Sequence, residues 1–443
     1  MGGFKAALPG ETFPTSRLVF ATPGDEQCFF GYYDKSPLDA TGQKLLCLRT
    51  TCTNPLPNDE DRAEVGYWSL ADGQWHAIGE TAAFNWQQGA MAQWLGPDFA
   101  QRIIYNDRRE GRFVAIIVDI NSGNENVIPH PIYTVHPDGC HALAIDFERH
   151  YFACRNYAYS GIVRPEKNQP IVPGDGIFHV DLKSGTTKKI IDIEKICARA
   201  PQSIEAGAAN TLEHLMFSPS GRRFMFLHRW VLPDGGINTR LYTADWQGGD
   251  LRLLLDSGKV THACWKGDDH IVCWGTPGES LGGRIAALRR SPFLGRFILK
   301  PLLAGYHRLP HRLAHRPALT RRLTGAGYLI LPDKENATPT ALAHNAFLRD
   351  GHPGWNPAFP DWLLTDTYED TMGFRNLYLY DAKKETRIDL ARLYSPPAFN
   401  EPPGNCDLHP RWDVSGHLVC VDSARDNGRR MYIFDVGDLV DSK

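Results

Sequence analysis

Four histidines share one local pattern in the second half of the sequence. Each stands three residues before an aromatic residue, and a short polar turn follows the aromatic residue; the four are His214, His262, His352 and His409. Neutral imidazole binds divalent cations and accepts protons near neutral pH. Four imidazoles at one repeated position therefore indicate a site for a divalent cation or for proton transfer. The competing interpretation is that each histidine only hydrogen-bonds to a neighbouring element.

The histidines recur because the sequence around them recurs. An apolar strand follows each polar turn, at residues 223–228, 270–274, 362–366 and 417–422, and further strands follow at 240–245, 376–381 and 431–435. Three more divergent copies precede these and begin near Tyr32, Met91 and Ile132. Seven copies of this pattern predict an all-β protein, a seven-bladed β-propeller of four-stranded antiparallel blades. Residues 17–21 are expected to complete the last blade.

A propeller would bring the repeated positions together. The first strand of each blade lines a common axis, so equivalent residues lie at the same height, and we expect the four histidines to face one shared space. Tyr33 lies at this level in the first blade. A second set of polar residues lies on or near the segments that follow the second strands and is predicted to contact a ligand, although for each the role of a solvated turn residue competes. These residues are Arg49, Asp107, Arg149, Tyr157, Asp366 and Arg411.

Residues 280–332 break the strand pattern. This segment has no acidic residue, ten lysines and arginines, and many leucines. It predicts short basic amphipathic helices inserted after the fifth blade of an otherwise single propeller domain over residues 1–443. Three interpretations remain open, namely a helical cap with a solvated basic face, an element lying on a membrane surface, and a lid that attracts an anionic glycan. Histidines at 307, 311 and 315 are spaced like metal ligands, but Pro310 argues against one helix carrying them.

Composition excludes several classes of protein. The chain of 443 residues has 48 basic and 51 acidic side chains, so it is not as a whole a binder of polyanions, and we predict no nucleic-acid partner. Its ten cysteines are scattered without a Cys-x-x-Cys pair, which is typical of reduced, buried thiols in a cytosolic protein. We find no apolar stretch of transmembrane length, no secretory signal pattern and no phosphate-binding glycine motif.

The blade opening His-x-x-aromatic-Ser-Pro-x-Gly resembles that of oligogalacturonate lyases and TolB-type propellers. Residues 28–37, 227–230 and 406–412 are also similar to propeller proteins linked to bacterial exopolysaccharide gene clusters. The resemblance implies a polysaccharide lyase that cleaves a uronic-acid-containing exopolysaccharide or oligosaccharide by β-elimination. It further implies His214 as the base and His262, His352 and His409 as ligands of a divalent metal, Mn²⁺ or Zn²⁺.

Such a lyase has to remove a proton next to a carboxylate. The developing enediolate needs a cation or an arginine beside it, and Arg229 and Arg411 are the alternatives to a metal. Tyr33 is the predicted acid for the leaving oxygen. The alternative function is a non-catalytic scaffold or glycan-binding module of exopolysaccharide biosynthesis, held at the inner membrane through residues 280–332. We predict a cytoplasmic protein whose partner is an acidic polysaccharide or oligosaccharide, with a peripheral position at the inner membrane as the alternative.

Overall fold

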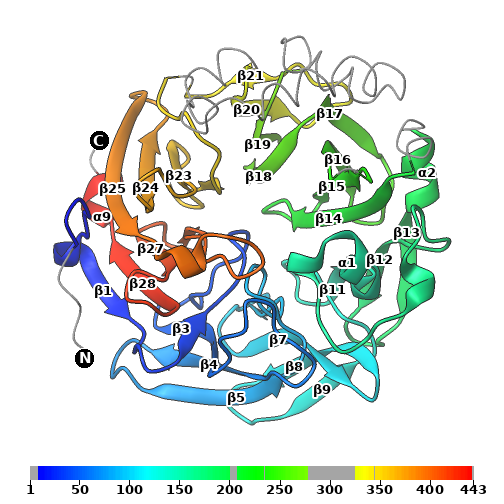
Figure 1. Ribbon diagram of the computed structural model, residues 1–443, viewed down its shortest axis with the longest axis horizontal. Coiled ribbons are helices and arrows are strands. Elements are labelled where there is room, and N and C mark those ends of the chain that lie inside the picture. The colour runs from blue at the N-terminus through cyan, green and yellow to red at the C-terminus, as the bar shows by residue number, and fades with distance from the viewer. Residues whose placement is uncertain (1–7, 200–206, 234, 278–324, 344, 442–443) are drawn as a thin grey trace. The chain divides into compact units, whose positions relative to one another are not determined.

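The computed structural model describes residues 8–199, 207–233, 235–277, 325–343 and 345–441. Their strands form seven four-stranded sheets, and every strand pairing recorded within these sheets is antiparallel. The fold is therefore the predicted seven-bladed β-propeller (Figure 1). The chain divides into two compact units, which are described one at a time. The first unit comprises residues 1–165, 179–188 and 351–443, and the second comprises residues 166–178 and 189–350.

Blades one, two, six and seven belong to the first unit. Their strands are β2 (Gln27–Phe29), β3 (Lys44–Thr50), β4 (Ala63–Ser69) and β5 (Trp75–Thr81); β6 (Gln93–Trp94), β7 (Arg102–Arg109), β8 (Arg112–Asp119) and β9 (Glu125–Ile128); β22 (Gly354–Trp355), β23 (Trp362–Asp366), β24 (Phe374–Asp381) and β25 (Thr386–Tyr394); and β26 (Arg411–Trp412), β27 (Leu418–Ser423), β28 (Arg430–Asp435) and β1 (Leu18–Ala21).

The remaining strands form blades three, four and five. They are β10 (Thr134–Val135), β11 (His141–Ala144), β12 (Gly176–Asp181) and β13 (Thr187–Asp192); β14 (Ala209–Phe217), β15 (Arg223–Val231), β16 (Ile237–Asp245) and β17 (Arg252–Gly258); and β18 (Val260–Lys266), β19 (His270–Gly275), β20 (Gly327–Pro332) and β21 (Thr340–Ala341). The helices α1 (Phe147–Ala153), α2 (Ile193–Ala198) and α9 (Gly437–Val440) lie in connections or near the C-terminus.

The middle strands of the blades are largely buried on both faces. In β19 the five residues after His270 are all buried, and all five residues of β23 are buried. A sheet covered on both faces has no need of the alternation between apolar and polar residues, so its strands are nearly continuous apolar runs. The packed core therefore lies between neighbouring blades, and one apolar cluster joins residues of blades one, two and seven.

Strand β1 completes blade seven. It pairs antiparallel with β28, with Leu18 opposite Phe434 and Ala21 opposite Tyr432, and the first and last strands of the chain thus share one sheet (Figure 1). Just before β1, the ring of Phe13 contacts Tyr432 edge-on at 5.6 Å. The prediction that residues 17–21 close the last blade is confirmed.

The insertion enters blade five at a different point from the predicted one. Its returning end, residues 327–332, forms β20, which pairs with β19 over its full length. The segment therefore lies between the second and third strands of blade five and not after the blade, and these six residues are strand and not helix. The apolar run Gly-Tyr-Leu-Ile-Leu-Pro follows leucine-rich residues, so the sequence pattern alone does not separate it from them. Residues 278–324, with the predicted basic helices, lie outside the described residues.

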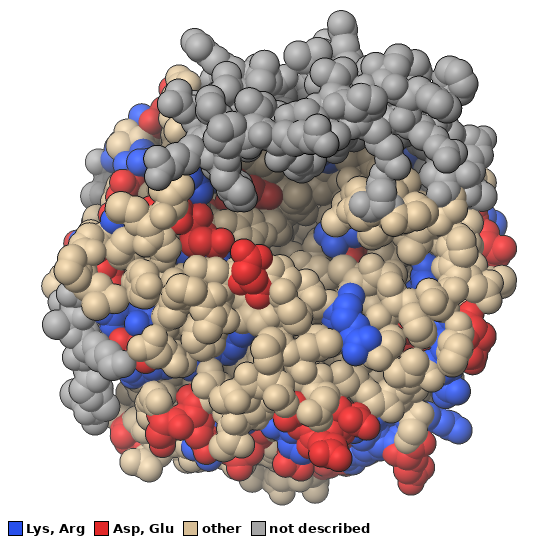
Figure 2. Space-filling view, in the orientation of Figure 1, with Lys and Arg blue, Asp and Glu red and all other residues tan. Residues whose placement is uncertain are grey.

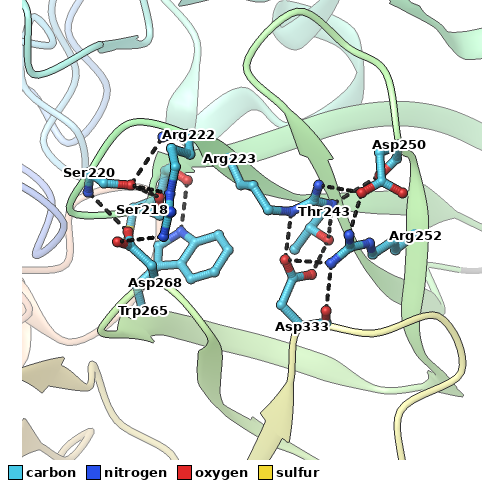
Figure 3. Close-up of polar contacts among 11 residues, drawn as sticks. Ser218, Ser220, Arg222, Arg223, Thr243, Asp250, Arg252, Trp265, Asp268 and Asp333 are labelled. Atoms are coloured by element: carbon cyan, nitrogen blue, oxygen red, sulfur yellow. Dashed lines mark hydrogen bonds and ion pairs between the residues drawn. The ribbon is translucent and has the colours of Figure 1, made fainter.

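An ion-pair network holds the end of β20 against blade four. The buried Asp333 accepts a hydrogen bond from Thr243 Oγ1 at 2.5 Å and contacts Arg252 Nη1 at 3.1 Å and Arg223 Nε at 2.5 Å. Asp250 contacts the same two arginines from their other side (Figure 3). One carboxylate therefore joins the strand that follows the insertion to three strands of the neighbouring blade.

The state of the cysteines and the distribution of charge agree with what the sequence predicts. All ten cysteines are free thiols, and apart from Cys140 and Cys154 they are buried, as predicted. On the face in Figure 2, acidic and basic side chains of the described residues are scattered in small groups, which agrees with the net charge of −3. Among the described helices, none combines the length and the apolar composition that crossing a bilayer requires.

We expect Asp333→Asn to lower the free energy of unfolding by about 1–3 kcal/mol, because it leaves buried arginine hydrogen bonds unsatisfied. Urea unfolding monitored by circular dichroism measures the change. The control is Asp250→Asn, whose side chain is 53% exposed, and it should cost less than about 1 kcal/mol. Equal costs for the two variants would contradict the role given to Asp333.

A buried histidine makes stability depend on pH. His228 in β15 is fully buried, its Nε2 lies 2.9 Å from Asn210 Oδ1, and burial lowers its pKa to about 3. The unfolded chain takes up this proton near pH 6.5, so stability should fall as the pH drops from 6.5 towards 3, by about 1.4 kcal/mol per pH unit for this group. We expect His228→Gln to flatten the profile of unfolding free energy against pH, whereas His270→Gln on the surface should leave it unchanged.

Candidate active site

Two of the four repeated histidines lie side by side. His352 precedes β22 and His409 precedes β26, so the two occupy the same repeat position in the adjacent blades six and seven. Their ring centroids are 4.4 Å apart, the rings are nearly perpendicular, and both side chains are buried. The repeat position therefore brings two imidazoles to one place in the first unit.

Hydrogen bonds fix the orientation of both rings. Nδ1 of His352 donates to the carboxylate of Asp366 at 2.9 and 3.0 Å, and the backbone N–H of His352 donates to the same carboxylate at 2.7 Å. Nδ1 of His409 donates to the carbonyl of Gly31 at 2.8 Å. Carboxylates and carbonyls only accept hydrogen bonds, so in each neutral ring the lone pair lies on Nε2. Histidine ligands of metals are held in this way in most proteins.

Asp407 completes a possible metal-binding group. One ligand atom from each of His352, Asp407 and His409 lies within 4.8 Å of the other two, and all three residues are buried. Asp407 forms an ion pair with the buried Arg375 and accepts a hydrogen bond from Asn405 Nδ2 at 2.7 Å. Two imidazoles and a carboxylate suit ions such as Mn²⁺ and Zn²⁺. The donor set and the partners behind each ligand therefore fit a divalent cation.

Asp407 was absent from the sequence prediction. It stands two residues before His409, and side chains two apart in an extended segment share a face. This spacing is the one sequence feature that points to Asp407. No carboxylate stands two residues before His214 or His262, so Asp407 does not stand out when the repeats are compared.

Tyrosine rings surround the pair of histidines. Tyr33 lies 5.2 Å from the ring of His352, and Tyr32 lies 5.1 Å from the ring of His409. Tyr157 contacts Tyr32 edge-on at 6.2 Å, while Tyr368 lies 5.7 Å from His352 and is 36% exposed. Burial and the neighbouring tyrosines raise the pKa of Tyr32 well above its usual value, so that phenol keeps its proton. A protonated phenol therefore lies beside the imidazoles.

An unusual backbone conformation recurs at the repeat position. Met91, His214 and His409 occupy the same position in blades two, four and seven, and their φ angles are 53°, 56° and 42°. Residues other than glycine adopt the left-handed region at a cost of about 1–3 kcal/mol. Pairing of β14 with β15 shifts register just here, between Glu213 and Met216. The aligned repeats therefore share a backbone conformation at this position in blades two, four and seven. The irregularity in the strand changes the direction of the side chain.

The other two histidines belong to the second unit, and each has a carboxylate beside it. Nε2 of His214 lies 3.7 Å from Oε1 of the buried Glu213, and the same oxygen lies 2.7 Å from Nε of Arg229. Nδ1 of His262 lies 3.1 Å from Oδ1 of Asp350. The sequence had not pointed to Glu213 or Asp350. Two of the four histidines lie in each unit. That all four face one shared space therefore stays a prediction.

The residues predicted to contact substrate have varied surroundings. Arg411 forms a buried, two-pronged ion pair with Asp422, and Asp366 holds His352. Arg49 pairs with Glu26 and Glu64, and Asp107 accepts hydrogen bonds from the backbone of Ala82 and from Arg109. Arg149 is buried in α1. Of the six, Tyr157, Asp366 and Arg411 contact the tyrosine and histidine cluster, Arg411 through the backbone carbonyl of Tyr32. Contact with substrate stays a prediction for all six.

Comparison with known proteins bears on the fold. No protein-family model matches the chain, and no curated protein is similar to it in sequence. Among solved structures, it is similar to an oligogalacturonate lyase in complex with manganese, with a TM-score of 0.60 and 15% identity over 97% of this chain and 96% of that one. The oligogalacturonate lyase from Vibrio parahaemolyticus gives 0.55 and 12% over 96% and 94%.

TolB from Acinetobacter baumannii is a more distant match, with a TM-score of 0.36 and 14% identity over 80% of this chain and 64% of that one. At these identities the likeness to the two lyases establishes a shared propeller fold. The manganese belongs to the lyase in which it was found.

We expect Asp366→Asn to weaken binding of Mn²⁺ by about 10–100-fold, because the partner behind a ligating histidine usually matters by that amount. Isothermal titration of chelator-treated protein measures the affinity. Asp389→Asn on the surface of the same blade is the control, since this side chain is 64% exposed. Unchanged affinity in Asp366→Asn would remove His352 from the proposed ligands.

Proposed function

We propose that the protein is a divalent-cation-dependent lyase that cleaves a uronic-acid-containing oligosaccharide or polysaccharide by β-elimination. The observation that carries the proposal is the buried group of His352, Asp407 and His409, with a supporting partner behind each ligand and tyrosine rings beside it. The likeness in fold to an oligogalacturonate lyase in complex with manganese supports the choice of reaction.

The proposed ligands suit an acidic substrate. A divalent ion bound by them supplies positive charge for the carboxylate of the uronate and for the enediolate that forms from it. Arg375, buried and ion-paired with Asp407, favours the ionised carboxylate that a ligand must present. Mn²⁺ is the ion we favour, because the structurally similar lyase is a manganese complex.

Two proton transfers complete the reaction. A base removes the proton α to the carboxylate, the C–H electron pair forms the new double bond, and the C–O bond to the leaving sugar breaks as its oxygen receives a proton. We assign the donor role to Tyr33, which lies against His352. We assign the base to His214, whose imidazole lies beside Glu213 and whose position in its blade is that of His409.

We further propose that the natural substrate is an acidic bacterial exopolysaccharide or an oligosaccharide derived from one. Tyr157 and the partly exposed Tyr368 offer ring faces at the edge of the cluster, and aromatic faces are suited to sugar rings. Arg229, fixed beside Glu213, remains the alternative cation for the enediolate.

We expect ultraviolet absorbance from unsaturated uronate products when the protein meets its glycan, with loss of the signal on chelation and recovery with Mn²⁺. Tyr33→Phe should lower turnover about 10²–10⁴-fold, the usual contribution of a proton donor, with no fall in melting temperature. Tyr67→Phe in the same blade is the control. Tight binding of an acidic glycan with no product from any tested uronate polymer would instead identify a glycan-binding module.

A further inference from the structure

A second cluster of metal-ligating residues lies in blade three, away from the histidines of the repeat position. The turn after β10 reads His136-Pro-Asp-Gly-Cys-His141, and β12 places His179 next to it. Nδ1 of His141 and Nε2 of His179 are 3.1 Å apart, and their ring centroids are 5.0 Å apart. This cluster is partly exposed, because His141 is 27% and Asp138 is 39% exposed.

The separation of the two nitrogens matches that of two ligands on one metal ion. Nitrogens bound to zinc at 2.0–2.1 Å with tetrahedral angles are about 3.3 Å apart. The two rings reach this separation from adjacent strands of one sheet, since β11 and β12 are neighbours. The backbone N–H of Leu182 donates to the carbonyl of Cys140 at 2.9 Å, which joins the two strands beside the histidines.

Asp138 favours the tautomer of His141 that a metal needs. Its Oδ2 lies 3.8 Å from Nε2 of His141, whereas His179 approaches the other nitrogen, Nδ1. A carboxylate beside Nε2 favours the proton there and leaves the lone pair on Nδ1, towards His179. In many metal sites one nitrogen of a histidine binds the metal while the other faces a carboxylate.

We propose that His141 Nδ1 and His179 Nε2 bind one transition-metal ion of the class that imidazole prefers, Zn²⁺, Ni²⁺ or Cu²⁺, with the carboxylate of Asp138 near the other nitrogen of His141. Water completes the coordination. The site differs in chemistry from the group of His352, Asp407 and His409, because both of its protein ligands are imidazoles. It is independent of the proposed lyase reaction and does not require it.

Metal titrations of the full-length, untagged protein test this site. Ni²⁺ and Zn²⁺ are titrated in competition with a chromophoric chelator, and the number of ions bound per chain is counted. We expect His179→Gln and His141→Gln each to lose one bound ion, or to bind it at least about tenfold more weakly. His76→Gln, a histidine stacked on Tyr67 in blade one, is the matched control and should bind as the natural chain does.

Circular dichroism in excess chelator checks that the variants fold, and a second readout uses the unaltered protein. Zn²⁺ should protect His141 and His179 from modification by diethyl pyrocarbonate, as read by mass spectrometry of the peptides that carry them. Equal ion counts in all variants, or no protection of these two histidines, would overturn the proposal. The contact would then be a hydrogen bond between two imidazoles and nothing more.

Discussion

The carbonyl oxygen of Gly31 is the point on which the candidate site depends. It accepts hydrogen bonds from Nδ1 of His409 and from Nη2 of Arg411, while Nε of Arg411 donates to the next carbonyl, that of Tyr32. One short segment between β2 and β3 of blade one thus sets the ring of a candidate ligand in blade seven and places the tyrosines. Gly31 is required there: its φ is +131°, and a Cβ atom would lie 2.5 Å from the backbone of Gln88.

Buried charge around this segment is paired. Arg411 is matched by Asp422 and Arg375 by Asp407, and all four side chains are nearly inaccessible to water. Breaking one partner of such a pair is costly because the other charge stays buried. Asp407 and Arg411 each stand two positions from His409 along the chain. Asp422 stands two positions after Cys420, the residue of β27 that lies opposite Arg411. Charge pairing therefore fixes the geometry at the histidines and leaves little freedom for the rings to turn.

The sequence predicted the seven blades, but it did not predict which groups form hydrogen bonds with the histidines. Repetition of a strand pattern is local information, and it predicted seven blades and the return of residues 17–21 to the last of them. Asp366 and the carbonyl of Gly31 meet His352 and His409 through tertiary contacts, and a backbone carbonyl has no sequence signal at all. The end of the insertion was misplaced because an apolar strand, residues 327–332, follows a leucine-rich segment without a polar boundary.

Pairing of β1 with β28 has a consequence for synthesis. Leu18 and Phe434 are opposite one another but more than four hundred residues apart along the chain. During translation β1 leaves the ribosome long before β28 exists, so its apolar side chains and unpaired backbone remain exposed until the residues of β28 have been made. Blade seven is the last to be completed, and contacts of such large sequence separation form slowly. The nascent chain therefore carries an unpaired apolar strand until β28 is made, and assistance by chaperones is most valuable in that interval.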